Sequence, residues 1–240
     1  MRKPTEIFKE IDERINSDIS PERIEANKRF FKEDIKSAGW SVPKVRSLGK
    51  EYLKILQKEQ YEFKHVLQLV EKLFKTTKLE QVTLGLEILK HYHKNYTPEL
   101  FPVFAKWTNY LTNWAHTDDF ARHYIAKLLI LDDSLFKELL KWTKSNNRWI
   151  RRASVVTLEI EASKGNKLKE VFTICNKLMK DEDEMVQKAI GWVLKEASRK
   201  HPQEVAAFLL HWKPKISRKI LSTACEKMPV GLKQKVLEKI

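Results

Sequence analysis

The segment Asn113–Phe120, which reads Asn-Trp-Ala-His-Thr-Asp-Asp-Phe, holds the residues best placed to do chemistry. On a helix, positions four apart lie on one face about one turn from each other. Trp114 and Asp118 have this spacing, so an aromatic ring and a carboxylate are expected to point to the same side. We interpret the pair as part of one binding surface, with Asp118 as the group that acts on what the surface binds.

Other catalytic or cofactor-binding motifs are absent from the sequence. It contains no glycine-rich phosphate loop, no H-E-x-x-H, no C-x-x-C and no G-x-S-x-G pattern. His116 and His123 share a helix face, but an exposed or hydrogen-bonded pair explains them better than a metal site. Cys175 and Cys225 have neither metal-ligand spacing nor a disulfide framework around them. The sequence therefore predicts a site without a metal or a cofactor.

The charge balance points to a polyanionic partner. The chain has 46 Lys and Arg against 32 Asp and Glu, a net charge of +14, which favours nucleic acid. The alternative is a soluble protein that happens to be basic. We interpret the Trp114 and Asp118 surface as lining a DNA-binding groove. The N-terminus lacks the apolar core of a signal peptide, and no apolar run approaches the ~18 residues of a membrane span. A cytoplasmic, bacterial protein is expected.

Apolar residues recur at helical spacing along the whole chain, and no stretch alternates as a strand does. Helices are expected over 4–17, 21–38 and from 43 onward. The later ones are expected at roughly 61–75, 79–94, 98–111, 114–130, 133–144, 147–163, 167–179, 183–199, 202–211, 216–227 and 231–240. Short connections make neighbouring helices antiparallel. The sequence thus predicts an all-α fold in a single domain, 1–240.

An internal repeat is visible in the second half. Trp149–Ala153 begins one helix, Met185–Ala189 begins another, and Ser217–Ile220 follows as a weaker match. Each is preceded by a helix with an apolar face. A helix pair repeated at this period is typical of a HEAT-like α-solenoid, in which pairs stack because one pair cannot bury its own face. Stacked pairs curve, so a concave surface is expected.

The repeat register places Arg152, Lys188 and Lys219 at equivalent positions. If the second helix of each pair lines the concave side, these three cations form a row that suits a phosphate backbone. The alternative is three solvated helix faces. Trp192 lies one turn after Lys188 and shares the expected groove face. The remaining tryptophans considered fit packing better: Trp107, Trp142 and Trp212.

The sequence resembles the AlkD-type DNA alkylation repair proteins, a family of HEAT-like-repeat DNA glycosylases, over nearly its whole length. Three ordered blocks carry the resemblance: Asn113-Trp114 with Asp118, then Asn147–Ala153, then Val186–Leu194. The third block is the most specific. Phe30–Gly39 and Pro43–Arg46 also fit the first repeat of the family.

The resemblance implies roles for individual residues. It makes Asp118 the catalytic carboxylate, Trp114 and Trp192 the flanking tryptophans, and Arg152 the arginine that holds the DNA backbone. Phe30 stands near a position where the family often has tyrosine, so it is expected to be a further groove aromatic without the hydroxyl. The expected DNA-binding set is completed by three more cations: Arg151, Lys188 and Lys219.

The implied activity is hydrolysis of the N-glycosidic bond of alkylated purines such as 3-methyladenine and 7-methylguanine. The implied partner is double-stranded DNA bound by a monomer, nucleoid-associated when bound, with no membrane and no cofactor. One departure stands out, because the typical W-D-x-V-D reads W-A-H-T-D here, with Ala115 after the tryptophan and Asp119 added beside Asp118.

Two alternatives remain open: a non-catalytic binder of damaged or branched DNA, and a HEAT scaffold that binds an acidic protein. Asp118 separates the enzyme from the pure binder, since a carboxylate in an anion-binding groove repels phosphate. The basic row and the two tryptophans disfavour the scaffold.

Overall fold

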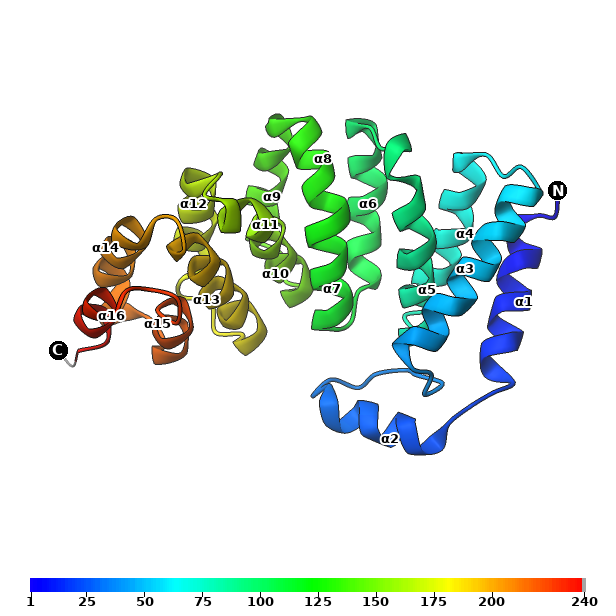
Figure 1. The fold of residues 1–240 in the computed structure, drawn as a ribbon, viewed down its shortest axis with the longest axis horizontal. Coiled ribbons are helices and arrows are strands. Elements are labelled where there is room, and N and C mark those ends of the chain that lie inside the picture. Colours follow the sequence, from blue (N-terminus) through cyan, green and yellow to red (C-terminus); the bar gives the residue numbers. More distant parts are fainter. Residues whose placement is uncertain (239–240) are drawn as a thin grey trace. The chain divides into compact units, whose positions relative to one another are not determined.

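The computed structural model describes residues 1–238, and every regular element within them is helical (Figure 1). The all-α fold class is therefore confirmed. The helices form two compact units, Met1–Phe120 (unit 1) and Ala121–Ile240 (unit 2). The single domain expected over 1–240 stays a prediction. No helix in the described part of the chain is long and apolar enough to cross a bilayer.

Unit 1 is built on helices that were expected from the apolar pattern. It contains α1 (Pro4–Asn16), α2 (Pro21–Phe30), α3 (Val42–Lys58), α4 (Phe63–Lys75), α5 (Leu79–Leu89), the 3-10 turns η1 (Lys90–Asn95) and η2 (Pro98–Leu100), α6 (Phe101–Trp107), η3 (Thr108–Tyr110) and α7 (Trp114–Phe120). α5 packs between α3 and α4, and α1 packs on α4. Trp107 is fully buried against Phe74, Phe104 and Phe120, as expected for a packing residue.

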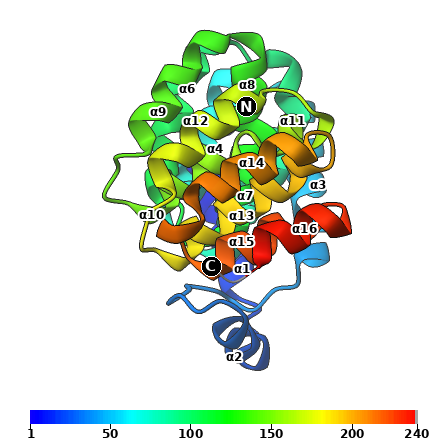
Figure 2. The same ribbon diagram turned by 90° about the vertical axis from the view of Figure 1, so that its left-hand side faces the viewer.

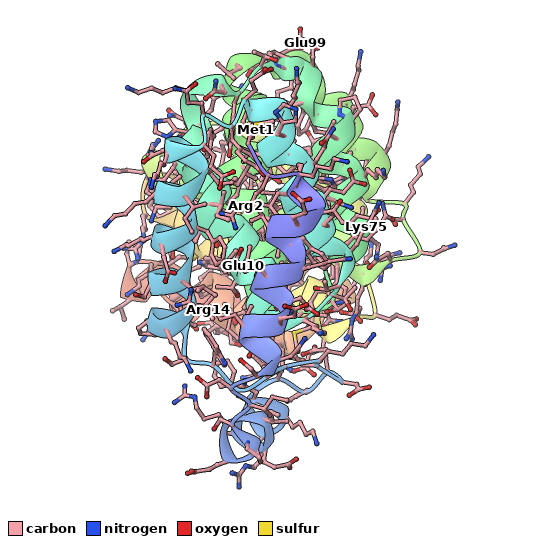
Figure 3. The ribbon with its side chains drawn as sticks, turned by 90° about the vertical axis from the view of Figure 1, so that its right-hand side faces the viewer. Met1, Arg2, Glu10, Arg14, Lys75 and Glu99 are labelled. Atoms are coloured by element: carbon pink, nitrogen blue, oxygen red, sulfur yellow. The ribbon has the colours of Figure 1, made fainter. Side chains whose placement is uncertain are left out.

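The N-terminal helix is attached by apolar burial and by ion pairs. Figure 3 labels Glu10 on α1 and Arg2, which precedes the helix, and the Arg2 guanidinium donates to both Glu10 and Glu59. Exposed ion pairs of this kind contribute little stability. The attachment therefore depends mainly on the stripe of fully buried side chains that α1 presents to the unit: Ile7, Ile11 and Ile15.

The helix expected over 21–38 is wrong at its C-terminal end. α2 stops at Phe30, and the backbone from there to α3 is irregular. The last part of this segment is held in a non-helical conformation by Glu80 on α5, whose carboxylate accepts hydrogen bonds from three consecutive backbone N–H groups and a hydroxyl. The donors are Ala38 (3.0 Å), Gly39 (2.9 Å), Trp40 (3.1 Å) and Ser37 Oγ (2.7 Å). These amides cannot also bond within a helix, and Gly39 adopts a φ of 81°.

α2 itself buries none of its residues. Figures 1 and 2 show it at the edge of unit 1, away from the packed helices. The helix is held by its ends and by a few polar contacts, including the Ser20 N–H to Ala38 carbonyl bond of 2.9 Å. α2 is therefore an arm of unit 1 rather than part of its core.

Unit 2 is arranged around its longest helix, α13. Its elements are the π-helical turn η4 (Ala121–Ile125), α8 (Ala126–Leu131), η5 (Asp133–Leu135), α9 (Phe136–Trp142), α10 (Arg148–Val156), α11 (Glu159–Lys164), α12 (Leu168–Leu178), α13 (Glu184–Ser198), α14 (Pro202–Trp212), η6 (Lys213–Lys215), α15 (Arg218–Ala224) and α16 (Val230–Leu237). α13 contacts α10, α11, α12, α14 and α15. The approach of α15 is close at Gly191, where an added Cβ would lie 2.9 Å from Thr223 Cβ.

The second helices of the three predicted pairs begin at capping side chains. Asn147 caps α10, Asp183 caps α13 and Ser217 caps α15, each accepting a bond from a backbone N–H of the first turn. The helix expected over 147–163 is interrupted at 157–158, giving α10 and α11. The expected helix over 231–240 is seen as α16, and positions 239 and 240 lie outside the described residues.

Candidate functional site

The two aromatic residues expected on one surface do meet in unit 1. Phe30, at the end of α2, and Trp114, at the start of α7, have ring centroids 5.6 Å apart. Phe31 completes the group, 5.0 Å from Phe30 and 5.6 Å from Trp114. Phe30 is 64% exposed, so this aromatic cluster reaches the surface. A flat or cationic group could stack on it.

Asp118 lies one turn after Trp114 on α7, as the spacing predicts, and only 9% of it is exposed. A carboxylate held away from bulk water interacts more strongly with a nearby positive charge than an exposed one does. The chain changes to the π-helical turn η4 directly after Phe120. Single π-helical turns occur frequently at functional sites.

The first turn of α7 is fixed by a buried polar network. The side-chain oxygen Oδ1 of Asn113 accepts a hydrogen bond from the His116 backbone N–H at 2.9 Å, and the side-chain nitrogen Nδ2 of Asn113 lies 3.0 Å from His116 Nδ1. His116 Nε2 lies 3.0 Å from Thr83 Oγ1, whose own hydroxyl donates to the Leu79 carbonyl. His116 is therefore a hydrogen-bonded, buried histidine, one of the two readings that the sequence left open. The network orients the helix that carries Trp114 and Asp118.

Acid is expected to destabilise the protein through His116. Burial lowers the pKa of His116 from 6.5 to about 4, so the folded chain keeps the ring neutral where the unfolded chain protonates it. The stability that depends on a neutral His116 is fully present above pH 6.5, where the unfolded chain is also neutral, and is lost as the pH falls through 4. It is on the order of 3 kcal/mol of unfolding free energy. Urea unfolding at pH 7.5 and pH 4.5 measures it.

The control for this prediction is the same experiment on His116→Gln and on exposed His93→Gln. His116→Gln should unfold more easily at pH 7.5 yet lose less stability on acidification than the parent. His93→Gln should behave as the parent does. An unchanged pH dependence in His116→Gln would show that His116 is not the group responsible.

A cavity of about 360 Å³ lies in unit 1 between the arm α2 and helices α3, α5 and α7, and we call it the α2 cavity. Phe30 and Phe31 line it, but Trp114 and Asp118 do not. From α7 it receives Ala115, His116 and Asp119 instead. Three further lining residues were not predicted: Arg23, Asn27 and Arg46. No sequence spacing could have found them, because four separate helices bring them together.

Trp192, the second expected tryptophan, is half-buried on α13 in unit 2. The Arg122 guanidinium lies 5.1 Å from the centroid of its ring, a cation–π distance. The same guanidinium donates from Nε to Glu159 at 2.6 Å. Arg122 was not singled out in the sequence, because it lies on η4 and no repeat register connects it to Trp192.

The two adjacent arginines of α10 are both engaged by protein groups. Arg152 is buried, and its guanidinium donates to the Met185 carbonyl of α13. Arg151 pairs with both carboxylate oxygens of Asp181, at 2.6 and 3.2 Å, and donates to the Ser145 carbonyl. These bonds tie α10 to the segment before α13. The predicted contacts of Arg151 and Arg152 with DNA stay predictions.

Lys188 and Lys219 are brought together by a shared carboxylate. Glu184 lies 2.8 Å from the Lys219 ammonium and 3.0 Å from that of Lys188. The hydrogen bonds from these two lysines lower the pKa of Glu184 to about 2. The repeat register thus placed the lysines side by side, but the acid between them was not predicted. Among residues 1–238, no three acidic, histidine or cysteine side chains gather closely enough to hold a metal ion.

Solved structures with a similar fold include three bacterial proteins. A predicted DNA alkylation repair enzyme from Enterococcus faecalis is 17% identical, covers 88% of this chain and 97% of its own, and has a TM-score of 0.75. AlkD2 from Streptococcus mutans is 16% identical, with 80% and 92% covered and a TM-score of 0.58. The protein smu.31 from Streptococcus mutans UA159 is 19% identical, with 78% and 99% covered and a TM-score of 0.56. At these identities the likeness shows the fold alone.

The sequence itself gives the stronger assignment. No curated protein matches it significantly. A family model described as DNA alkylation repair enzyme, however, matches residues 11–228, which is most of the chain. The matched range includes Trp114, Trp192 and Asp118, together with helices α10, α13 and α15 of unit 2. The chain belongs to the DNA alkylation repair enzyme family.

Proposed function

We propose that the protein is a DNA glycosylase that hydrolyses the N-glycosidic bond of cationic alkylated purines, such as 3-methyladenine and 7-methylguanine, in duplex DNA. The observation that carries the proposal is the placement of a buried carboxylate, Asp118, one turn from Trp114 in an aromatic cluster. A surface that only bound DNA would gain nothing from this acid, since a carboxylate repels phosphate.

The chemistry asked of these residues is modest. Alkylation of a ring nitrogen makes the purine a cationic leaving group, so little acid assistance is needed as the bond breaks. The bond between C1′ and the base nitrogen breaks with both electrons leaving on the base, which departs neutral. Asp118 stabilises the positive charge that develops on the sugar and accepts a proton from the water whose oxygen bonds to C1′. Trp114 and Phe30 attract the cationic base by roughly 0.5–2 kcal/mol per ring.

Unit 2 supplies DNA contacts in this proposal. The contacts between successive second helices, α10 with α13 and α13 with α15, support a stack of HEAT-like helix pairs. On that stack Arg152, Lys188 and Lys219 would meet phosphates, and Trp192 would add an aromatic contact. The test of the whole proposal is release of a methylated purine from alkylated duplex DNA, with Asp118→Asn as the matched variant that should release it much more slowly.

A second function, binding of damaged or branched DNA without cleavage, is favoured by one observation. Asp118, Arg151 and Arg152 are all largely enclosed by protein, and the two arginines donate to protein oxygens. If the parent protein binds alkylated DNA but releases no base, this second function is the correct one.

Removing the acid between the two lysines is expected to strengthen DNA binding. Glu184→Gln frees Lys188 and Lys219 from their shared partner, so both can neutralise phosphates. The fall of log affinity with log salt should then steepen by up to about 0.9 for each lysine gained. The measurement is a titration of an undamaged duplex at several salt concentrations.

Glu204→Gln provides the matched control, since it makes the same charge change on α14 at an acid that pairs with His201 rather than with a lysine. It should raise affinity slightly and leave the slope almost unchanged. Equal slopes for the two variants would remove Lys188 and Lys219 from the DNA contact.

A further inference from the structure

The α2 cavity has walls that suit a flat heterocycle. Phe30, Phe31 and Trp40 contribute aromatic surface, while Val45 and Leu86 contribute aliphatic surface. Its volume of about 360 Å³ falls in the range of about 300–1,000 Å³ that is usual for sites of small ligands. Stacking of a base on such surfaces does not depend on its identity, because every base has a π face.

Polar groups inside the cavity could hydrogen-bond to the edge of a base. The side-chain amide nitrogen of Asn27 donates to Ser37 Oγ at 3.0 Å, and among residues 1–238 nothing donates to the side-chain amide oxygen, Oδ1, of Asn27. One N–H and one C=O therefore remain, the pair with which asparagine recognises a base edge. The Glu80 carboxylate, in contrast, is occupied by the loop that precedes α3.

The mouth of the cavity is cationic. Arg23 on α2 and Arg46 on α3 both line it and are both exposed. Arg23 pairs with no acid in the described part of the chain, and Arg46 only approaches Glu87, at 3.9 Å. A cavity with aromatic walls and two arginines at its rim matches one nucleotide, with its base inside and its phosphate outside.

We propose that the α2 cavity binds one unpaired nucleobase of a DNA strand, while Arg23 and Arg46 hold the adjoining phosphate. This inference rests on DNA as the ligand of the proposed function, and it adds a second contact to that function. A stacked base cannot enter the cavity, so only a base turned out of the duplex fits. Neither Trp114 nor Asp118 lines the cavity, so this contact is assigned to other residues than those two.

The test compares three duplexes of one sequence. The first is fully paired, the second has one base opposite an abasic analogue, and the third has abasic analogues on both strands at that position. The second and third duplexes are similarly flexible, and they differ only in whether an unpaired base is present at that position. The parent is expected to bind the second duplex about tenfold more tightly than the third, the scale of one stacked base. Equal affinities for those two duplexes would overturn the proposal.

Ala115→Leu fills the cavity from α7 and is expected to reduce this preference to about one. Its matched control is Ala26→Leu, the same change at an exposed position of α2 outside the cavity, which should keep the preference. If Ala115→Leu does not fold, the proposal is tested instead by comparing Arg23→Gln with Arg29→Gln. Both arginines are exposed on α2, but only Arg23 lines the cavity. The preference should fall in Arg23→Gln alone, and an equal effect of both would overturn the proposal.

The outcome is separable from that of the proposed function. Asp118→Asn should release the methylated purine about a hundredfold or more slowly than the parent yet keep the preference for the unpaired base. A parent protein that shows the preference but releases no methylated purine leaves the cavity assignment standing and removes the glycosylase. A parent that releases the purine without the preference removes the cavity assignment alone.

Discussion

Asp118→Asn is expected to slow the release of a methylated purine by about two orders of magnitude or more, the scale of losing one electrostatic stabiliser of a transition state. The substitution is nearly isosteric and removes one negative charge from a position that is 9% exposed. DNA affinity should hold or improve, because the lost carboxylate repels phosphate in the ground state and acts only as positive charge develops. Single-turnover release and a binding titration measure the two effects.

Asp119→Asn is the matched comparison, since it removes the same charge at the next residue. Its side chain points about 100° away around the helix, and it lines the α2 cavity instead. It should change the rate much less. Equal rates for Asp118→Asn and the parent would exclude Asp118 from the chemistry, and a larger effect of Asp119→Asn would move the catalytic role to the cavity side of α7.

Trp114→Ala and Trp192→Ala are expected to lose roughly tenfold in base release each, in line with a cation–π contribution of 0.5–2 kcal/mol. Both side chains are half-buried, so the fold should persist. Trp107→Ala is the contrasting variant, because Trp107 is fully buried. Its truncation should cost ~3–5 kcal/mol of unfolding free energy.

Urea unfolding of the three tryptophan variants, together with assays of base release, shows whether each tryptophan is a surface residue or a core residue. A loss of stability in Trp114→Ala or Trp192→Ala as large as in Trp107→Ala would show that the residue is a packing residue. Its assignment to a DNA-binding surface would then be wrong.

The helices could be predicted from the sequence because apolar periodicity and capping residues are local signals. The helix starts expected at 147, 183 and 216 lie within two residues of the observed starts of α10, α13 and α15, whose N-caps are Asn147, Asp183 and Ser217. The non-helical backbone of 38–40 could not be predicted, because it is bound by the carboxylate of Glu80, a residue distant in sequence. Local periodicity carries no information about such a partner.

For the site, too, the features set by local helix geometry could be predicted, whereas those set by packing could not. The placement of Asp118 one turn after Trp114 follows from helix geometry. The family resemblance made Phe30 a further groove aromatic, and its ring centroid lies 5.6 Å from that of Trp114. The acid between Lys188 and Lys219 was missed, because repeat register aligns like residues and says nothing of Glu184 one turn earlier. The α2 cavity was missed because four helices must pack before it exists.

In unit 1, the exposed surface of α2 and the attachment of the loop that follows it depend on different residues. The arm buries no side chain, whereas the loop that follows it is bound by a carboxylate on α5 that is only 1% exposed. Substitutions along α2 can therefore accumulate without changing the stability of the packed helices. The identity of Glu80, in contrast, is constrained by four donors at once. Such an arrangement lets the surface chemistry of the arm diversify over evolution while the scaffold that presents it stays the same.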